Sequence, residues 1–83
     1  MPISSISKQF GTAVRKRRMA IGMSQEKLAE QAGLHPTYIS MIERGVRNGT
    51  LDVAARIAKA LKVELPKLIE ESMQKRGRSL GKA

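Results

Sequence analysis

The apolar residues of this 83-residue chain recur every three or four positions, and strict alternation of apolar with polar residues is absent. A spacing of three to four residues places side chains on one face of an α-helix, whereas a strand repeats every two residues. Glycines, prolines and small polar clusters separate the periodic stretches. The pattern therefore predicts an all-α fold of five short helices, over residues 6–21, 25–32, 36–44, 51–61 and 65–75.

Residues at the ends of these stretches support the boundaries. Ser24 and Thr50 are good N-caps, because their hydroxyls can accept a hydrogen bond from an exposed helix N–H. Pro36 suits a first helical turn, and Gly33 suits a helix end because glycine adopts the left-handed conformation. The residues expected on the inner faces are Phe10, Val14, Ile21, Leu28, Ala29, Ala32, Ile39, Ile42, Leu51, Ala54, Ala55, Ala58 and Leu61.

The chain is long enough for one small domain. We expect this domain over residues 6–75, preceded by an extension over 1–5 and followed by a basic, disordered tail over 76–83. Cysteine is absent, which is typical of proteins from a reducing compartment. No apolar run approaches the roughly 20 residues that a membrane-spanning helix needs. These features fit a reducing cytosol or a nucleus, and of the two we expect a cytoplasmic location.

Positive charge dominates the composition. Lysine and arginine number 16 against 7 acidic residues, which gives a formal net charge of +9. An excess of this size favours a polyanionic partner, since each phosphate that is neutralised releases condensed counterions. Charge alone does not separate nucleic acid from an anionic membrane surface. A protein that is basic without such a partner is a third interpretation.

The helices predicted over 25–32 and 36–44 are joined by only three residues. Gly33 permits a tight left-handed turn, and Ala29 is small enough for the second helix to cross close to the first. Two helices joined at about 90–120° by a short glycine turn form a helix-turn-helix. An ordinary corner in a helical bundle is the alternative, and the positive charge favours the helix-turn-helix.

The second helix of this pair has an unusual outer face. Ile39 and Ile42 mark its inner side. Thr37, Ser40 and Met41 then point outward. Hydroxyls can exchange hydrogen bonds with base edges in the major groove of DNA, and a methionine can contact a thymine methyl group. The outer face therefore predicts a recognition helix for double-stranded DNA.

Two further features have more than one interpretation. Tyr38, on the flank of the same helix, can bind a phosphate through its hydroxyl or be a half-buried tyrosine with a wet hydroxyl, and both can hold together. Residues 15–18 read Arg-Lys-Arg-Arg and are a candidate nucleic-acid patch. Helical spacing prevents the four from facing one way, and Arg17 can simply be solvated.

Three motifs carry a resemblance to a known family: GMSQEKLAEQAGL, TYISMIERG and LDVAARIAKAL. With their surroundings, over residues 10–70, they resemble the Xre/Cro-type helix-turn-helix regulators of bacteria and phages. The run TYIS-x-IER-x-x-RN-x-T is similar to the controller proteins of restriction–modification systems. The resemblance implies a compact five-helix, lambda-repressor-like DNA-binding domain that regulates transcription, with its helix-turn-helix over residues 25–44.

The resemblance also implies roles for individual residues. The positions that face the bases are Pro36, Thr37, Ser40 and Met41. Proline has no donor, so one polar base contact is absent or replaced by an apolar one. We expect contacts to the DNA backbone from Ser24, Gln25, Tyr38, Arg44, Arg47 and Asn48. The last two match loop positions that either touch the backbone or enter the minor groove. Gln25 matches the glutamine that holds a phosphate at a helix start. Arg18 and Glu43 match a buried ion pair between the first helix and the end of the recognition helix.

The last predicted helix carries an apolar stripe of Leu65, Leu68, Ile69 and Met73. Four helices already close a small core, so part of this stripe is a candidate homodimer interface, which similar proteins build from this region. The alternative is that the stripe only covers the core. A two-fold dimer would place two recognition helices about 34 Å apart on a pseudo-palindromic operator.

An enzyme is not expected. The chain has no cysteine, no glycine-rich phosphate loop and one histidine, His35, without a catalytic partner. We therefore predict no catalytic residue, no metal and no cofactor. Short helices with charges of both signs disfavour a membrane-surface role, and the lack of stacking aromatics disfavours RNA. The alternative function is an antitoxin or accessory protein of a toxin–antitoxin or mobile-element module, which would bind a protein partner as well as DNA.

Overall fold

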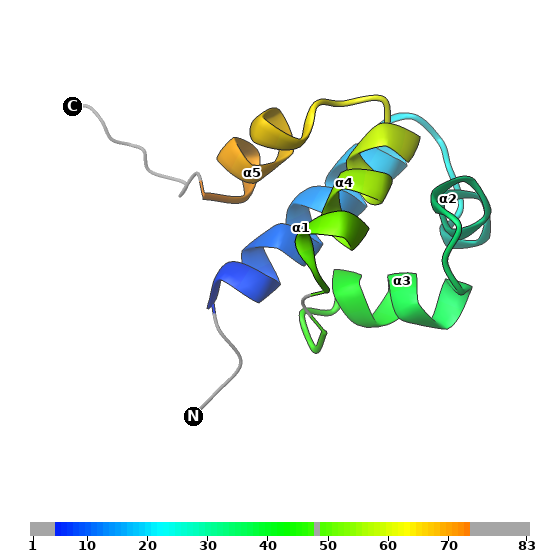
Figure 1. Cartoon of the computed structure of the whole chain (residues 1–83), viewed down its shortest axis with the longest axis horizontal. Coiled ribbons are helices and arrows are strands. Elements are labelled where there is room, and N and C mark those ends of the chain that lie inside the picture. Colours follow the sequence, from blue (N-terminus) through cyan, green and yellow to red (C-terminus); the bar gives the residue numbers. More distant parts are fainter. Residues whose placement is uncertain (1–4, 48, 74–83) are drawn as a thin grey trace.

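Five helices make up the part of the chain that the computed structural model describes, residues 5–47 and 49–73. They are α1 (Ser5–Ala20), α2 (Gln25–Ala32), α3 (Pro36–Glu43), α4 (Leu51–Ala60) and α5 (Leu65–Met73) (Figure 1). These residues contain no strand, so the predicted all-α class with five helices is confirmed. Most of the predicted extension, Asn48, the end of the predicted fifth helix and the predicted tail lie outside the described residues.

Side chains cap the starts of three helices. The Oγ of Ser24 accepts a hydrogen bond from the Lys27 N–H at 3.0 Å, and the Oγ1 of Thr50 accepts one from the Val53 N–H at 3.2 Å. The Nδ1 of His35 accepts a hydrogen bond from the backbone N–H two residues on, at 3.1 Å. These bonds satisfy donors that a helix start leaves without an intrahelical partner. The single histidine therefore serves the start of α3.

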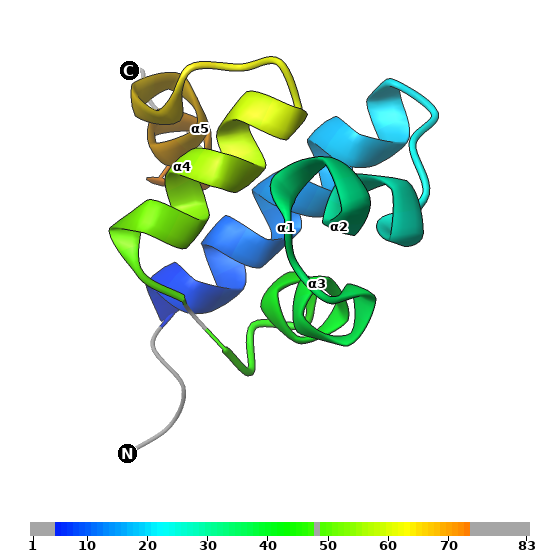
Figure 2. The same cartoon turned by 45° about the vertical axis from the view of Figure 1, so that its right-hand side comes forward.

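The core lies where all five helices meet. Its largest fully buried side chains are Val14 of α1, Leu28 of α2, Ile39 and Ile42 of α3, Ile57 of α4, Leu61 just after α4 and Leu68 of α5. Helix α1 packs against α3 and α5, and α2 packs against α3 and α4. In Figure 2, α3 lies at the lower side of the domain and α5 at the upper side. The two helices of the turn motif are therefore held in place by the other three.

Three residues predicted for inner faces are exposed instead. Ile21 is 49% exposed, because α1 ends one residue before it and the chain turns there. Leu51 is 77% exposed, because it is the first residue of α4 and projects beyond the core. Ala55 is also exposed, since the buried face of α4 begins with Ala54 and continues one helical turn later. These three predictions were wrong for one reason: each residue lies at an end or an edge of its apolar stripe.

Leu68 occupies a different place from the predicted one. We expected it in a dimer interface, but its side chain is 0% exposed and packs in the core of its own chain. Helix α5 packs along α1, so one part of its apolar stripe is buried in the core and another part is exposed. Leu65 is partly buried against the core, whereas Ile69 and Met73 are exposed. Successive helical residues differ in direction by about 100°, so one stripe can serve two surfaces.

Helix α1 approaches the end of α3 closely at Gly11. A Cβ atom at this position would lie 2.8 Å from the carbonyl oxygen of Glu43 and still closer to that of Ile42. Both oxygens belong to the backbone of α3, so they cannot move aside as a flexible side chain would. Glycine at this position therefore allows the distance between α1 and α3.

Replacing Gly11 with alanine is expected to lower the free energy of unfolding by about 1–3 kcal/mol, the usual cost of overpacking. Alanine has the higher helix propensity by about 1 kcal/mol, so a stabilised variant would contradict the close approach. Urea denaturation followed by circular dichroism measures the change. Thr12→Ala, at the next and exposed position of α1, is the control and is expected to change stability by less than about 0.5 kcal/mol.

An ion pair fastens α5 to α1. The Nε and Nη2 of Arg17 donate to the two carboxylate oxygens of Glu71 at 2.9 and 2.5 Å. This hydrogen-bonded pairing, with a smaller effect of the nearby positive charges, lowers the pKa of Glu71 below its ordinary value of 4.5. The same hydrogen bond raises the pKa of Arg17. The guanidinium that was predicted as solvated or DNA-facing therefore has a partner within the fold.

The Arg17–Glu71 pair is expected to make stability depend on pH. Because folding lowers the pKa of Glu71, the contribution is fully present above pH 4.5 and is lost as the pH falls through the lower, folded value. The wild-type chain should melt at a higher temperature than Glu71→Gln at neutral pH, and the difference should close in strong acid. Thermal unfolding across this range measures it. Glu70→Gln, which removes a more exposed glutamate, should show a smaller change, and a difference that is constant with pH would contradict the assignment.

Candidate nucleic-acid interface

The turn between α2 and α3 is built around Gly33. Its φ of 71° and ψ of 36° lie in the left-handed region that glycine adopts without strain. The N–H of Leu34 donates to the carbonyl oxygen of Ala29 at 2.8 Å, which closes α2 and redirects the chain. Ala29 is buried beneath the crossing of the two helices. Figure 2 shows α2 and α3 side by side at this turn, and the helix-turn-helix arrangement is present.

Helix α3 has a buried side and a surface side. Ile39 and Ile42 are fully buried and fix the helix to the core. The four residues predicted to face bases lie outside the core, with Pro36 and Thr37 exposed and Ser40 and Met41 half-buried. None of the four is acidic, so this side of α3 can approach a polyanion without a repelling side chain.

Tyr38 joins the flank of α3 to the loop that follows it. Its ring is partly buried against the core, and the guanidinium carbon of Arg47 lies 5.6 Å from the ring centroid. A cation at this distance from an aromatic face is attracted to it. A Cβ atom on Gly49 would lie 3.2 Å from the tyrosine hydroxyl, so the loop passes close to that group. Tyr38 therefore packs against the core and also lies beside a cationic side chain.

A buried network connects α1, the start of α2 and the end of α3. The carboxylate of Glu43, whose side chain is 3% exposed, accepts hydrogen bonds from the Nε and Nη2 of Arg18 at 2.7 and 3.0 Å. It also accepts one from the Nε2 of Gln25 at 3.0 Å, and the Nη1 of Arg18 donates to the carbonyl oxygen of Met23 at 2.8 Å. The resemblance pointed to the Arg18–Glu43 pair but gave no reason to expect Gln25 in it.

The network fixes the position of Gln25 relative to α3. Gln25 is the first residue of α2 and Glu43 is the last residue of α3, so their hydrogen bond holds these two helix ends together. Glu43 can only accept, so the amide nitrogen of Gln25 must face it. One amide hydrogen of Gln25 is left, together with its backbone N–H at the helix start. Of the other predicted backbone contacts within the described residues, Tyr38 is half-buried, and Ser24, Arg44 and Arg47 are exposed.

The described ranges, residues 5–47 and 49–73, hold neither a metal cluster nor a membrane span. No group of three or more His, Cys, Asp or Glu side chains there could hold a metal ion. Over the same residues, no helix has both the length and the apolar character that crossing a bilayer demands.

Two short helices, a glycine turn and a surface side of α3 free of acidic groups define a helix-turn-helix DNA-binding domain. Comparison with known proteins agrees with this class. A helix-turn-helix family model matches residues 14–68, which is more than half of the chain. The chain belongs to this family, as an Xre/Cro-type helix-turn-helix protein.

Similar proteins include two control proteins and a restriction-modification controller protein. The chain is 52% identical over 62 residues to control protein C.BamHI of Bacillus amyloliquefaciens, covering 74% of this chain and 76% of that protein. It is 50% identical over 56 residues to control protein C.SmaI of Serratia marcescens, covering 68% and 67%. The solved structure of the restriction-modification controller protein C.AhdI from Aeromonas hydrophila matches with a TM-score of 0.73 and 40% identity, over 75% of this chain and 94% of that one.

The family membership gives the general function. The protein is a DNA-binding transcriptional regulator and not an enzyme. The positive charge and the outer face of α3 predicted DNA as the binding partner, and the sequence motifs predicted the family.

Proposed function

We propose that the chain is a controller-type transcriptional regulator that binds a specific duplex operator as a homodimer. The observation that carries the proposal is that α3 has one buried side and one surface side. Ile39 and Ile42 pack in the core, and Thr37, Ser40 and Met41 lie at the surface. The likeness to C.BamHI and C.SmaI supports a control function. The likeness to C.AhdI supports a place in a restriction–modification system.

In the proposed complex, α3 lies in the major groove. Thr37 and Ser40 exchange hydrogen bonds with base edges, and Met41 contacts thymine methyl groups. Pro36 has no N–H to donate, so it contributes apolar contact only. Few polar side chains of the protein therefore read the DNA sequence directly. The shape of the groove, which depends on that sequence, contributes the remaining specificity.

Contacts to phosphates hold α3 in register. The backbone N–H of Gln25 lies at the start of α2, where the helix dipole favours an anion. Its remaining amide hydrogen can donate to the same phosphate, while the bond to Glu43 keeps the side chain in place. Ser24, Tyr38, Arg44, Arg47 and Asn48 are the other proposed backbone contacts. Phosphate contacts position a protein on DNA without selecting its sequence.

The dimer is proposed to form through α5. Ile69 and Met73 are exposed on this helix, and Leu65 is partly buried beside them, whereas Leu68 belongs to the core. A two-fold axis would then place two copies of α3 about 34 Å apart, one helical turn of DNA. A regulator of bacterial or phage promoters acts in the cytoplasm, which is the location we propose.

Gel shift against genomic fragments over a range of salt concentrations tests this function. The proposal predicts at least one fragment that is bound at salt concentrations where random duplex is not. Equal binding to every fragment at all salt concentrations would reject sequence specificity. The accessory-protein alternative stays a prediction, and co-purification with the product of a neighbouring gene tests it.

Arg47→Ala is expected to weaken binding to operator and random duplex alike. A dimer loses two phosphate contacts, so the slope of log K against log salt concentration should become shallower by about 1.8. Lys67→Ala, which removes a lysine from α5, is the matched control and should leave the slope unchanged. An unchanged slope for Arg47→Ala would remove this arginine from the proposed contacts.

A further inference from the structure

His35 caps α3 with its side chain and its main chain together. Its Nδ1 accepts a hydrogen bond from the Thr37 N–H at 3.1 Å. Its carbonyl oxygen accepts hydrogen bonds from the N–H groups of Tyr38 at 3.0 Å and Ile39 at 3.2 Å. Pro36, the first residue of the helix, has no N–H. Every backbone donor in the first turn of α3 is therefore absent or already paired, and none is left for DNA.

The hydrogen bond from Thr37 also fixes the tautomer of the imidazole. In an uncharged imidazole one ring nitrogen carries the hydrogen and the other accepts. Because Nδ1 of His35 accepts, the hydrogen lies on Nε2. The two nitrogens point in diverging directions, so the Nε2–H points away from the backbone of α3. Among residues 5–47 and 49–73 it has no hydrogen-bond partner, and the side chain is exposed.

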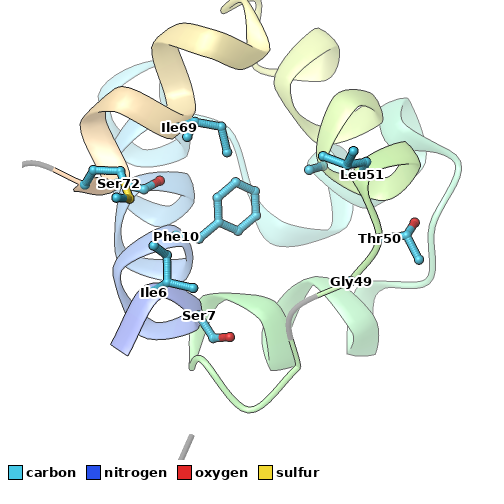
Figure 3. Close-up of a pocket in the computed structure, with 10 residues that line it drawn as sticks. Ile6, Ser7, Phe10, Gly49, Thr50, Leu51, Ile69 and Ser72 are labelled. Carbon is cyan, nitrogen blue, oxygen red and sulfur yellow. The ribbon is translucent and has the colours of Figure 1, made fainter. Parts of the chain in front are cut away.

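The other two side-chain caps use hydroxyl groups. Ser24 caps α2 through its Oγ, and Thr50, which borders the pocket shown in Figure 3, caps α4 through its Oγ1. Serine, threonine, aspartate and asparagine are the residues that helix starts favour, and histidine is not among them. Capping alone therefore gives no reason for an imidazole at position 35, whose second nitrogen has no role within the described residues.

The position of His35 determines which acceptors its donor can meet. It directly precedes Pro36 and Thr37, two of the proposed base-facing residues, and all three are exposed. A recognition helix enters the major groove with its N-terminal residues at the base edges. Guanine offers two adjacent acceptors there, O6 and N7, whereas cytosine offers the N4 donor. A single N–H at this place therefore favours guanine and disfavours cytosine.

We propose that His35 reads one guanine in each half of the operator, with its Nε2–H donating to O6 or N7 in the major groove. The inference rests on the proposed operator binding and adds a specificity-determining residue to it. His35 supplies the polar contact that Pro36 lacks. Because Thr37 holds the ring through Nδ1, the donor is oriented before DNA binds, which lowers the entropy cost of the contact.

Two conservative variants separate capping from base reading. In asparagine the side-chain oxygen takes the place of Nδ1, so His35→Asn keeps the cap and removes the donor at Nε2. In glutamine the amide nitrogen takes the place of Nε2, so His35→Gln keeps a donor and weakens the cap. The melting temperature of His35→Asn should equal or exceed that of the wild type, and that of His35→Gln should be lower. Affinity for the operator should rank the two variants in the opposite order.

Fluorescence anisotropy measures the reading of the base. The DNAs are the operator, random duplex, and operators with one base pair changed in both half-sites. The wild type should lose about 10-fold in affinity when the guanine is replaced, because a dimer loses two hydrogen bonds. His35→Asn should bind the unchanged operator about 10-fold more weakly, should not distinguish bases at that position, and should bind random duplex like the wild type. Gln31→Ala, an exposed change on α2, is the control and should match the wild type.

Two results would overturn the inference while the proposed function stands. If His35→Asn binds the operator as tightly as the wild type and keeps its base preferences, His35 is a cap only. If His35→Asn loses the same affinity for operator and random duplex, the imidazole contacts a phosphate and reads no base. A wild-type protein that binds every duplex equally would instead reject operator recognition itself, and the reading of a guanine with it.

Discussion

Replacing Glu43 with alanine is expected to lower the free energy of unfolding by about 3–5 kcal/mol. The carboxylate is almost fully buried and accepts two hydrogen bonds from Arg18 and one from Gln25. Its removal leaves the guanidinium of Arg18 desolvated, with only the carbonyl oxygen of Met23 as a partner. A chain of this length has about 4–12 kcal/mol in total. Glu43→Ala is therefore expected to lose a large part of the total free energy of unfolding, and urea denaturation measures the loss.

The double variant Arg18→Met with Glu43→Leu is the informative control. Apolar residues of similar volume often replace a buried ion pair without loss, since no unpaired charge is left. We expect the double variant to regain most of the stability that Glu43→Ala loses. A loss below about 1 kcal/mol in Glu43→Ala would mean that water reaches Arg18 and that the pair is not buried in solution.

Replacing Thr37, Ser40 and Met41 together with alanine is expected to weaken operator binding by at least about 100-fold. Each lost base contact costs about 1–3 kcal/mol, and a dimer loses every contact twice. Binding to random duplex should change little, because the phosphate contacts stay in place. Fluorescence anisotropy with both DNAs at one salt concentration measures the ratio.

The control for the triple variant removes polar side chains elsewhere on the surface. Thr12→Ala with Gln31→Ala changes exposed residues of α1 and α2 and should leave both affinities unchanged. An equal loss of affinity for operator and random duplex in the triple variant would show that the three residues only touch the DNA backbone. Melting temperatures of all variants exclude a loss by unfolding.

The helix boundaries could be predicted because local chemistry decides them. Gly33 adopts the positive φ that a tight turn needs, and Ser24 and Thr50 accept hydrogen bonds from helix starts. The inner faces of α2 and α3 followed from spacing alone, since short helices between strong boundaries have only one apolar side. The candidate DNA-facing surface followed from the same spacing, as the side opposite Ile39 and Ile42.

Spacing could not predict whether a given apolar residue is buried or exposed. Leu51 and Leu68 both belong to apolar stripes, yet one is exposed and the other is in the core. A stripe shows that a helix has an apolar side, but how α5 lies against α1 decides which part of that side is covered. The prediction that Ile21 is buried was wrong because α1 ends one residue before it.

Contacts between polar side chains distant in the sequence were also beyond prediction. Arg17 and Glu71 are 54 residues apart, and a charged residue on a helix surface has many possible partners. The place of Gln25 beside Glu43 depends on how α2 and α3 cross. Gly11 gave the weakest signal of all, because a glycine within a helix usually indicates only low helix propensity.

Methylation interference on an operator selected by the wild-type protein tests the central claim, that the surface side of α3 enters the major groove. Dimethyl sulfate modifies guanine N7 in the major groove and adenine N3 in the minor groove. The account predicts that guanine N7 methylation blocks binding in two clusters about one helical turn apart, symmetric about the operator centre. Interference confined to adenine N3, with binding indifferent to every guanine, would contradict it.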